Sequence, residues 1–123
     1  MPQGGIMGAK IKIRELFRGT FGAIAQNGNI ISESVDLRDL YTDGNFSLHM
    51  INTGGTVTVT LLVCSTVNGT FIEPSTPVVI LNAKAAGSHF EAFTAPTAGF
   101  VKFKFTETNV APVTAMDAWL NYQ

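Results

Sequence analysis

Apolar and polar residues alternate with a period of two over much of the chain, which is typical of β-strands with one buried face. The clearest example lies at residues 56–63, where threonines face one side and four apolar residues the other: Val57, Val59, Leu61 and Val63. The same alternation marks residues 10–14, 46–50, 101–106 and 116–122. No segment has the apolar spacing of a convincing amphipathic helix. We therefore expect a chain built from short strands.

Residues that favour turns separate these strands at short intervals. Asn27-Gly28 and Asn68-Gly69 each predict a tight turn, because asparagine and glycine accept the positive φ angles that such turns need. We expect Asn52–Gly55 to close one strand and Ala83–Gly87 to form a loop, whereas residues 36–41 fit either one helical turn or a loop. The pattern predicts an all-β fold, an antiparallel β-sandwich or jelly roll of about eight strands.

The length of 123 residues fits one domain. Residues 1–9 are rich in glycine and show no periodicity, so we expect a flexible N-terminal arm ahead of a single β-sandwich domain at residues 10–123. The first residues lack the basic and then apolar layout of a signal peptide, and no apolar stretch reaches the ~18 residues that cross a membrane. The expected protein is made in the cytoplasm, is not secreted by a signal peptide and has no membrane partner.

Charge is the most unusual feature of the composition. Charged residues make up only 14% of the chain, whereas about 25% is usual for a soluble domain. Because surface charge keeps isolated domains apart, the shortage of ionic groups predicts that other subunits cover much of the surface. A low-charge monomer is the alternative. The net charge of −1 argues against nucleic acid as a partner, since that would require a basic face to neutralise phosphates.

Residues that carry chemistry are few and form no recognisable active site. The sequence contains no nucleophile motif and no phosphate-binding glycine loop ahead of a helix. The two histidines, His49 and His89, have no third metal ligand at a recognisable spacing. We therefore expect no catalytic residue, no metal ion and no cofactor, and the chain is not expected to be an enzyme.

Two further features have a structural and a functional interpretation. Asp36, Asp39 and Asp43 could form a calcium loop, but their spacing differs from that of an EF-hand, so a solvated acidic turn is favoured. Cys64 is the single cysteine and excludes an internal disulfide. It lies in an apolar run and is expected to be a small buried residue rather than a nucleophile.

The residues expected to contact a partner lie near the two ends of the chain. Trp119 points away from Met116 and Leu120, which places it outside the expected core, and an exposed tryptophan usually marks an interface. The partner could be a protein or a glycan. Protein is favoured, because polar partners for sugar hydroxyls do not cluster near Trp119 in the sequence. The predicted interface consists of Ile6, Met7, Lys10, Lys12, Arg14 and Trp119.

Several stretches resemble a known class of proteins. They are residues 34–40, residues 55–61 running into 65–71, and residues 99–107 with the closing residues 118–123. Their layout, over roughly residues 30–123, resembles that of small β-sandwich structural proteins in the virions of tailed bacteriophages. These proteins include capsid decoration (cement) proteins and tail-associated subunits.

The resemblance implies a structural role without enzymatic activity. The chain would be a subunit of the virion, in the first place a decoration protein that stabilises neighbouring subunits. Its partners would be the phage major capsid or tail proteins and further copies of itself, often three in decoration proteins. The alternative is a carbohydrate-binding β-sandwich module, either on a phage appendage or attached to an enzyme.

Overall fold

The computed structural model describes residues 11–38 and 45–123. Within these ranges it contains seven strands, one short 3-10 helix and no α-helix. The elements are β1 (Lys12–Phe17), η1 (Gly19–Gly22), β2 (Asn29–Ile31), β3 (Val35–Asp36), β4 (Phe46–Cys64), β5 (Val79–Phe93), β6 (Phe100–Glu107) and β7 (Met116–Tyr122). The expected arm at residues 1–9 lies outside the described residues, as do Asp39 and Asp43.

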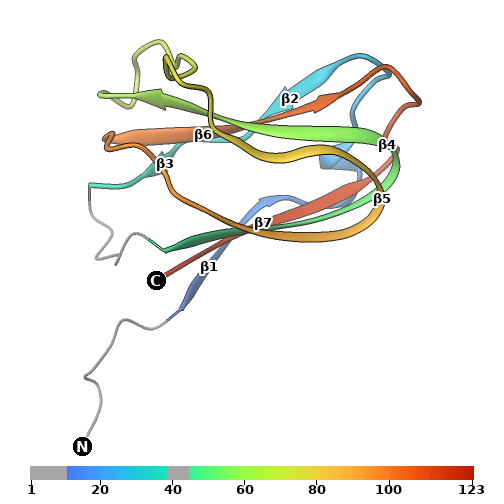
Figure 1. The fold of residues 1–123 in the computed structure, drawn as a ribbon, viewed down its shortest axis with the longest axis horizontal. Helices are drawn as coiled ribbons and strands as arrows, with labels where there is room; N and C mark the ends of the chain where they lie inside the picture. Colours follow the sequence, from blue (N-terminus) through green and yellow to red (C-terminus); the bar gives the residue numbers. More distant parts are fainter. Residues whose placement is uncertain (1–10, 39–44) are drawn as a thin grey trace, which may run out of the picture.

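One antiparallel sheet contains all seven strands and folds over on itself into two layers (Figure 1). β4, with 19 residues, is long enough to belong to both layers. Its first half pairs with β7 and its second half with β6, while β5 follows β4 through both layers. β1 extends the first layer beyond β7, and β2 and β3 extend the second beyond β6. This confirms the expected all-β, antiparallel fold.

β4 turns from one layer to the other near Gly54-Gly55. The pairing of β4 with β5 slips between Asn52 and Thr56, as it does at a β-bulge. The slip exchanges the two faces of the strand, so even-numbered residues face the core before the corner and odd-numbered residues face it afterwards. The buried residues of β4 follow this change: Phe46, Leu48 and Met50, then Val57, Val59 and Leu61.

Glycine is required at this corner. Gly55 has a φ of +64°, which residues with a side chain rarely adopt. A Cβ atom on Gly55 would also lie 2.5 Å from the carbonyl oxygen of Ala111. The prediction that Asn52–Gly55 closes a strand is therefore wrong, because these residues bend a strand that continues to Cys64.

The prediction of a loop at Ala83–Gly87 is wrong for the same reason. These residues lie inside β5, which bends together with β4 and so keeps its hydrogen bonds through the corner. The bend is taken up by positive φ angles at Ala83 (+49°) and Gly87 (+143°). Because both expected breaks are bends within long strands, the described chain has seven strands rather than about eight.

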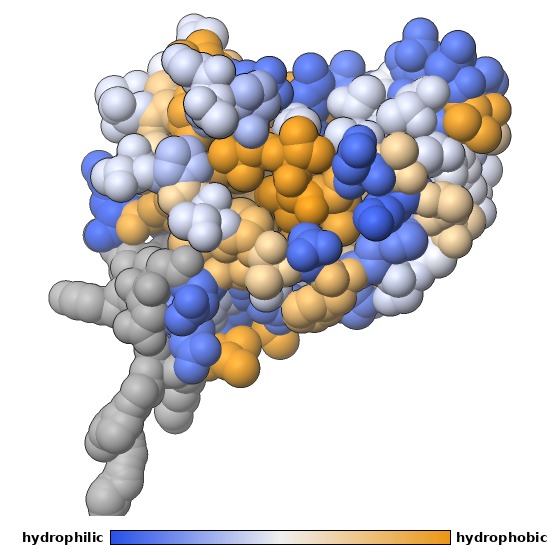
Figure 2. All heavy atoms as spheres, viewed as in Figure 1, coloured by the Kyte–Doolittle hydropathy of each residue, from blue (hydrophilic) through white to orange (hydrophobic). Residues whose placement is uncertain are grey.

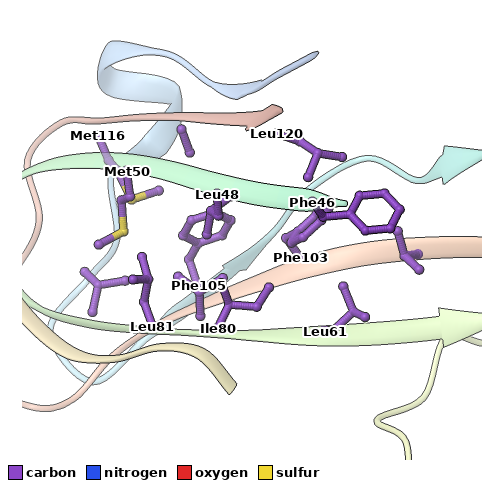
Figure 3. Close-up of a cluster of buried hydrophobic side chains, with 14 of the residues drawn as sticks. Phe46, Leu48, Met50, Leu61, Ile80, Leu81, Phe103, Phe105, Met116 and Leu120 are labelled. Carbon is purple, nitrogen blue, oxygen red and sulfur yellow. The ribbon is translucent and has the colours of Figure 1, made fainter. Parts of the chain in front are cut away.

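The core lies between the two layers and is apolar (Figure 3). Phe103 and Phe105 of β6 are fully buried there, and the ring of Phe17 packs edge-on against Phe105 at 5.4 Å. On one side of the molecule, apolar atoms also reach the surface between the layers (Figure 2). The buried cluster consists of Ile24, Val35, Phe46, Leu48, Met50, Val57, Val59, Leu61, Ile80, Leu81, Val101, Phe103, Phe105, Val113, Met116, Ala118 and Leu120.

Glu107 joins three segments of backbone at the corner end of the sandwich. Its side chain is fully buried. Its carboxylate accepts hydrogen bonds from the backbone N–H groups of Asn27 (2.8 Å), Asn109 (2.8 Å), Val110 (3.0 Å), Thr56 (3.1 Å) and Ala111 (3.3 Å). Burial alone would raise the pKa of this carboxyl group. The backbone N–H groups outweigh that effect and lower the pKa from its usual 4.5 to about 2.

Candidate interaction surface

The outer surface of the first layer carries a row of aromatic rings. Leu48 and Leu120 face the core from β4 and β7, so the adjacent residues His49 and Trp119 point outward. Trp119 lies opposite His49, and His49 lies opposite Phe90 of β5. The ring of His49 is therefore held between two others, with its centroid 4.9 Å from that of Trp119 and 5.3 Å from that of Phe90.

Exposed isoleucines of β1 and the residue before it extend this row. Ile11 and Ile13 are 66% and 67% exposed, and Phe90 is 62% exposed. Such exposure is common for a single large apolar residue but unusual for several on one sheet face. We call the five residues Ile11, Ile13, His49, Phe90 and Trp119 the apolar patch.

A small polar area lies between the two edges of the apolar patch. It consists of Asn45, Ser47, Asn121 and Gln123, which we call the polar cluster. Two shallow hollows lie over it, one bordered by Ile13, His49, Phe90 and Trp119 and the other by Ile11, Phe90 and Tyr122. None of the described residues that line these hollows is an aspartate, glutamate, lysine or arginine. The hollows are therefore apolar at their edges, polar in the middle and free of charged side chains, while Glu15 and Asp117 lie further along the same face of the layer.

The structure places the predicted interface residues on different surfaces. Trp119 lies in the apolar patch and outside the core, as predicted. Lys12 and Arg14 point to the opposite face of β1 from Ile13. Arg14 donates a hydrogen bond to the carbonyl oxygen of Ser34 (3.2 Å) and so connects β1 to the segment between β2 and β3. The remaining predicted residues lie outside the described ranges: Ile6, Met7 and Lys10.

Sequence reasoning missed most of the apolar patch. The alternation over residues 10–14 suggests that Ile11 and Ile13 face the core, but both are exposed. The physical reason is a slip in the pairing of β1 with β7 between Glu15 and Phe17, after which Phe17 packs against the core. The interruption of the alternation at Leu16-Phe17 was a usable signal for this slip.

The outer surface of the second layer has a different character. The outward residues of β6 and the second half of β4 are mainly lysine and threonine, among them Lys102, Lys104 and Thr60. Lys102 extends over the ring of Phe71, with its Nζ 4.5 Å from the ring centroid. Ile31 of β2 is 46% exposed on this side and provides a useful comparison with Ile13. The two outer surfaces thus differ in charge and in aromatic content.

Cys64 is the described residue with the most reactive side chain. Cys64 is half-buried, so the prediction of a buried cysteine is wrong; it lies at the end of β4, where the layers no longer cover it. A hydrogen bond from the backbone of Thr66 lowers the pKa of the Cys64 thiol. In residues 11–38 and 45–123, no three His, Cys, Asp or Glu side chains are grouped so as to hold a metal ion. Over the same ranges, no helix is long and apolar enough to cross a membrane.

Comparisons with known proteins give distant similarities of shape and none of sequence. No family model matches the chain, and no curated protein matches it. The crystal structure of PirA is similar with a TM-score of 0.49 and 10% identity, over 98% of this chain and 100% of that chain. A chain of infectious bursal disease virus, Gx strain, has a TM-score of 0.45 and 9% identity, over 98% of this chain and 36% of that one. Neither similarity is close enough to assign a family or a function.

Proposed function

We propose that this chain is a non-enzymatic structural subunit of a tailed phage particle, and that it binds a neighbouring capsid or tail protein through the apolar patch. The observation that carries the proposal is the grouping of Ile11, Ile13, Phe90 and Trp119 on one sheet surface, around hollows that no charged side chain lines. Among the structural subunits of a phage particle, the resemblance in sequence favours a capsid decoration protein.

The chemistry of the patch suits a protein partner. The centres of protein interfaces are depleted in charged residues and enriched in tryptophan and phenylalanine. A tryptophan at such a centre often supplies a large share of the binding free energy. A specific contact also buries about 800 Å² on each partner, so the neighbour must cover more than the patch itself. The low overall charge of the chain fits a surface that is extensively covered.

Binding of the purified chain to particles that lack it tests the proposal. The particles come from the phage that carries the gene, and binding is measured by co-sedimentation. Trp119→Ala is expected to weaken binding about thirtyfold, the effect of losing ~2 kcal/mol at a central contact. Ile13→Asp is expected to abolish binding, since it buries a charge without a partner.

The matched control is Ile31→Asp, which places the same charge at an exposed isoleucine of the other layer. This variant is expected to bind normally. If Ile13→Asp and Trp119→Ala bind as well as the original chain, the apolar patch is not the contact surface. If neither the original chain nor any variant binds the particles, the virion function itself is contradicted.

Carbohydrate binding is a second candidate, and one observation favours it. The fold brings the polar cluster next to Trp119 and Phe90, although in sequence Asn45 and Ser47 lie far from Trp119. Amide and hydroxyl groups beside an aromatic ring can together bind a sugar, whose hydroxyls need hydrogen bonds and whose ring face is apolar. Titration with neutral oligosaccharides, followed by Trp119 fluorescence, tests this. Saturable binding that Asn121→Ala abolishes would support this second function, and an unchanged signal would contradict it.

A further inference from the structure

The second half of β5 is an open edge of the first layer. Among the described residues, β5 pairs with β4 and with no other strand. Ser88, Phe90, Glu91 and Ala92 are all exposed along it. An edge strand of this kind presents unpaired backbone N–H and C=O groups, which can pair with another strand.

This half of β5 is also straight. From Gly87 to Phe93 it pairs with Asn52 to Phe46 without any slip in register. The slips and the positive φ angles of β5 all lie at or before Gly87. Bulges and kinks are common protections of a sheet edge, and they are confined here to the other half of the strand.

The residues of the straight half are compatible with a second strand. The segment Gly87–Phe93 contains no proline and no lysine, which are the usual means of blocking an edge. Its one acidic residue, Glu91, lies two positions from His89. His89 is held along the strand, with its Nε2 atom 2.7 Å from the carbonyl oxygen of Ala85.

We propose that two copies of the chain associate by antiparallel pairing of this segment, with Phe90 at the two-fold axis. In this register Phe90 lies opposite Phe90 of the second copy, and His89 lies opposite Glu91 of the second copy, twice by symmetry. Ser88 lies opposite Ala92 of the second copy. The segment is thus complementary to itself. The two Phe90 rings pair on one face of the strand, and the two pairs of His89 with Glu91 lie on the other.

The pairing would join the first layers of both copies into one continuous sheet. Each copy contributes β1, β7, the first half of β4 and the second half of β5. The aromatic row would then run from Trp119 through His49 and Phe90 across the axis and back to Trp119 of the second copy. This inference depends on the edge of β5 and not on the proposed virion function, so either can fail without the other.

Cysteine cross-linking tests both the surface and the register. In a Cys64→Ser background, Phe90→Cys places two thiols directly opposite each other across the axis, within the Cα separation that a disulfide spans. Oxidation is expected to convert most of this variant to covalent dimer on a non-reducing gel. The double variant Ser88→Cys with Ala92→Cys is expected to do the same, because each cysteine faces the other kind in the second copy.

The matched control is Ala92→Cys alone, on the same outward face of the same strand. Two cysteines at position 92 would lie about 13 Å apart in the dimer, because four residues of strand separate their positions. This variant is expected to stay monomeric on the gel. Equal cross-linking in Ala92→Cys and Phe90→Cys would contradict the register.

The mass of the unmodified chain in solution provides the second measurement. Light scattering is expected to give twice the mass of one chain at high concentration, and Phe90→Lys is expected to return it to a single chain, since two like charges would lie directly opposite each other. A single-chain mass at every concentration would overturn the proposal. So would an oligomer whose mass Phe90→Lys does not change.

Discussion

Glu107 is the side chain on which the corner end of the molecule most depends. It is fully buried, and its carboxylate connects the turn at Asn27, the corner of β4 and the segment after β6 through backbone N–H groups alone. A neutral side chain cannot satisfy so many donors, and a glutamine would place two further donors among them. Three of its partners, at residues 109–111, follow it directly in the chain, whereas Asn27 and Thr56 are brought to it only by the fold.

The depressed pKa of Glu107 predicts a loss of stability in acid. The folded state holds the pKa at about 2, whereas the unfolded chain has the usual 4.5. The unfolded state therefore binds the proton more readily, so the stabilisation is fully present above about pH 4.5 and is lost as the pH falls toward 2. Urea unfolding at a series of pH values should show this loss.

Two variants separate Glu107 from the general effect of acid. Glu107→Gln is expected to be less stable than the original chain at neutral pH and to lose less stability between pH 4.5 and 2. Glu73→Gln removes an exposed carboxylate and serves as the control for the loss of one negative charge. An identical acid dependence in Glu107→Gln and the original chain would show that Glu107 does not contribute it.

At the scale of elements, alternation identifies strands but does not show where they bend. The alternation correctly places β6 and β7 and their buried residues, among them Phe103 and Leu120. It also places Trp119 outside the core. It fails at Asn52–Gly55 and Ala83–Gly87, because glycine is equally suited to a tight turn between two strands and to a corner within one strand. Only the pairing of β4 with β5 distinguishes these, and that pairing is not local in sequence.

The corner of β4 predicts a difference between two glycine substitutions. Gly19 and Gly55 have similar positive φ angles, +58° and +64°. A Cβ on Gly19 would meet no atom within 4 Å, whereas one on Gly55 would meet the backbone of Ala111. Gly19→Ala should therefore lower the free energy of unfolding by about 1–2 kcal/mol, the ordinary cost of a left-handed residue. Gly55→Ala should lower it by clearly more.

Chemical unfolding of the two variants measures this difference. The comparison removes the contribution of backbone conformation, because both substitutions share it. What remains is the displacement of the segment around Ala111, and with it the hydrogen bonds to Glu107. Equal losses of stability in the two variants would mean that the corner has room for a side chain and that the contact with Ala111 does not shape it.

At the scale of the whole molecule, the sandwich has two outer surfaces of different chemistry. One carries the apolar patch, with Glu15 and Asp117 on the same face; the other carries Lys102, Lys104 and threonines. The sequence indicated Trp119 and the shortage of charge, but not the patch, whose residues come from β1, β4, β5 and β7 and from the residue before β1. Patches of this kind are assembled by strand pairing, so a single strand gives no sign of them.

We propose above that a neighbouring protein covers the apolar patch. Hydroxyl-radical footprinting of the chain, free and bound to phage particles, tests it most directly, because mass spectrometry reports the oxidation of individual side chains. Binding is expected to protect Trp119 and Ile13. Phe21, which is 85% exposed on η1, and Phe71, on the other outer surface, are expected to stay as reactive as in the free chain. Unchanged oxidation of Trp119 and Ile13 together with protection of Phe71 would contradict it.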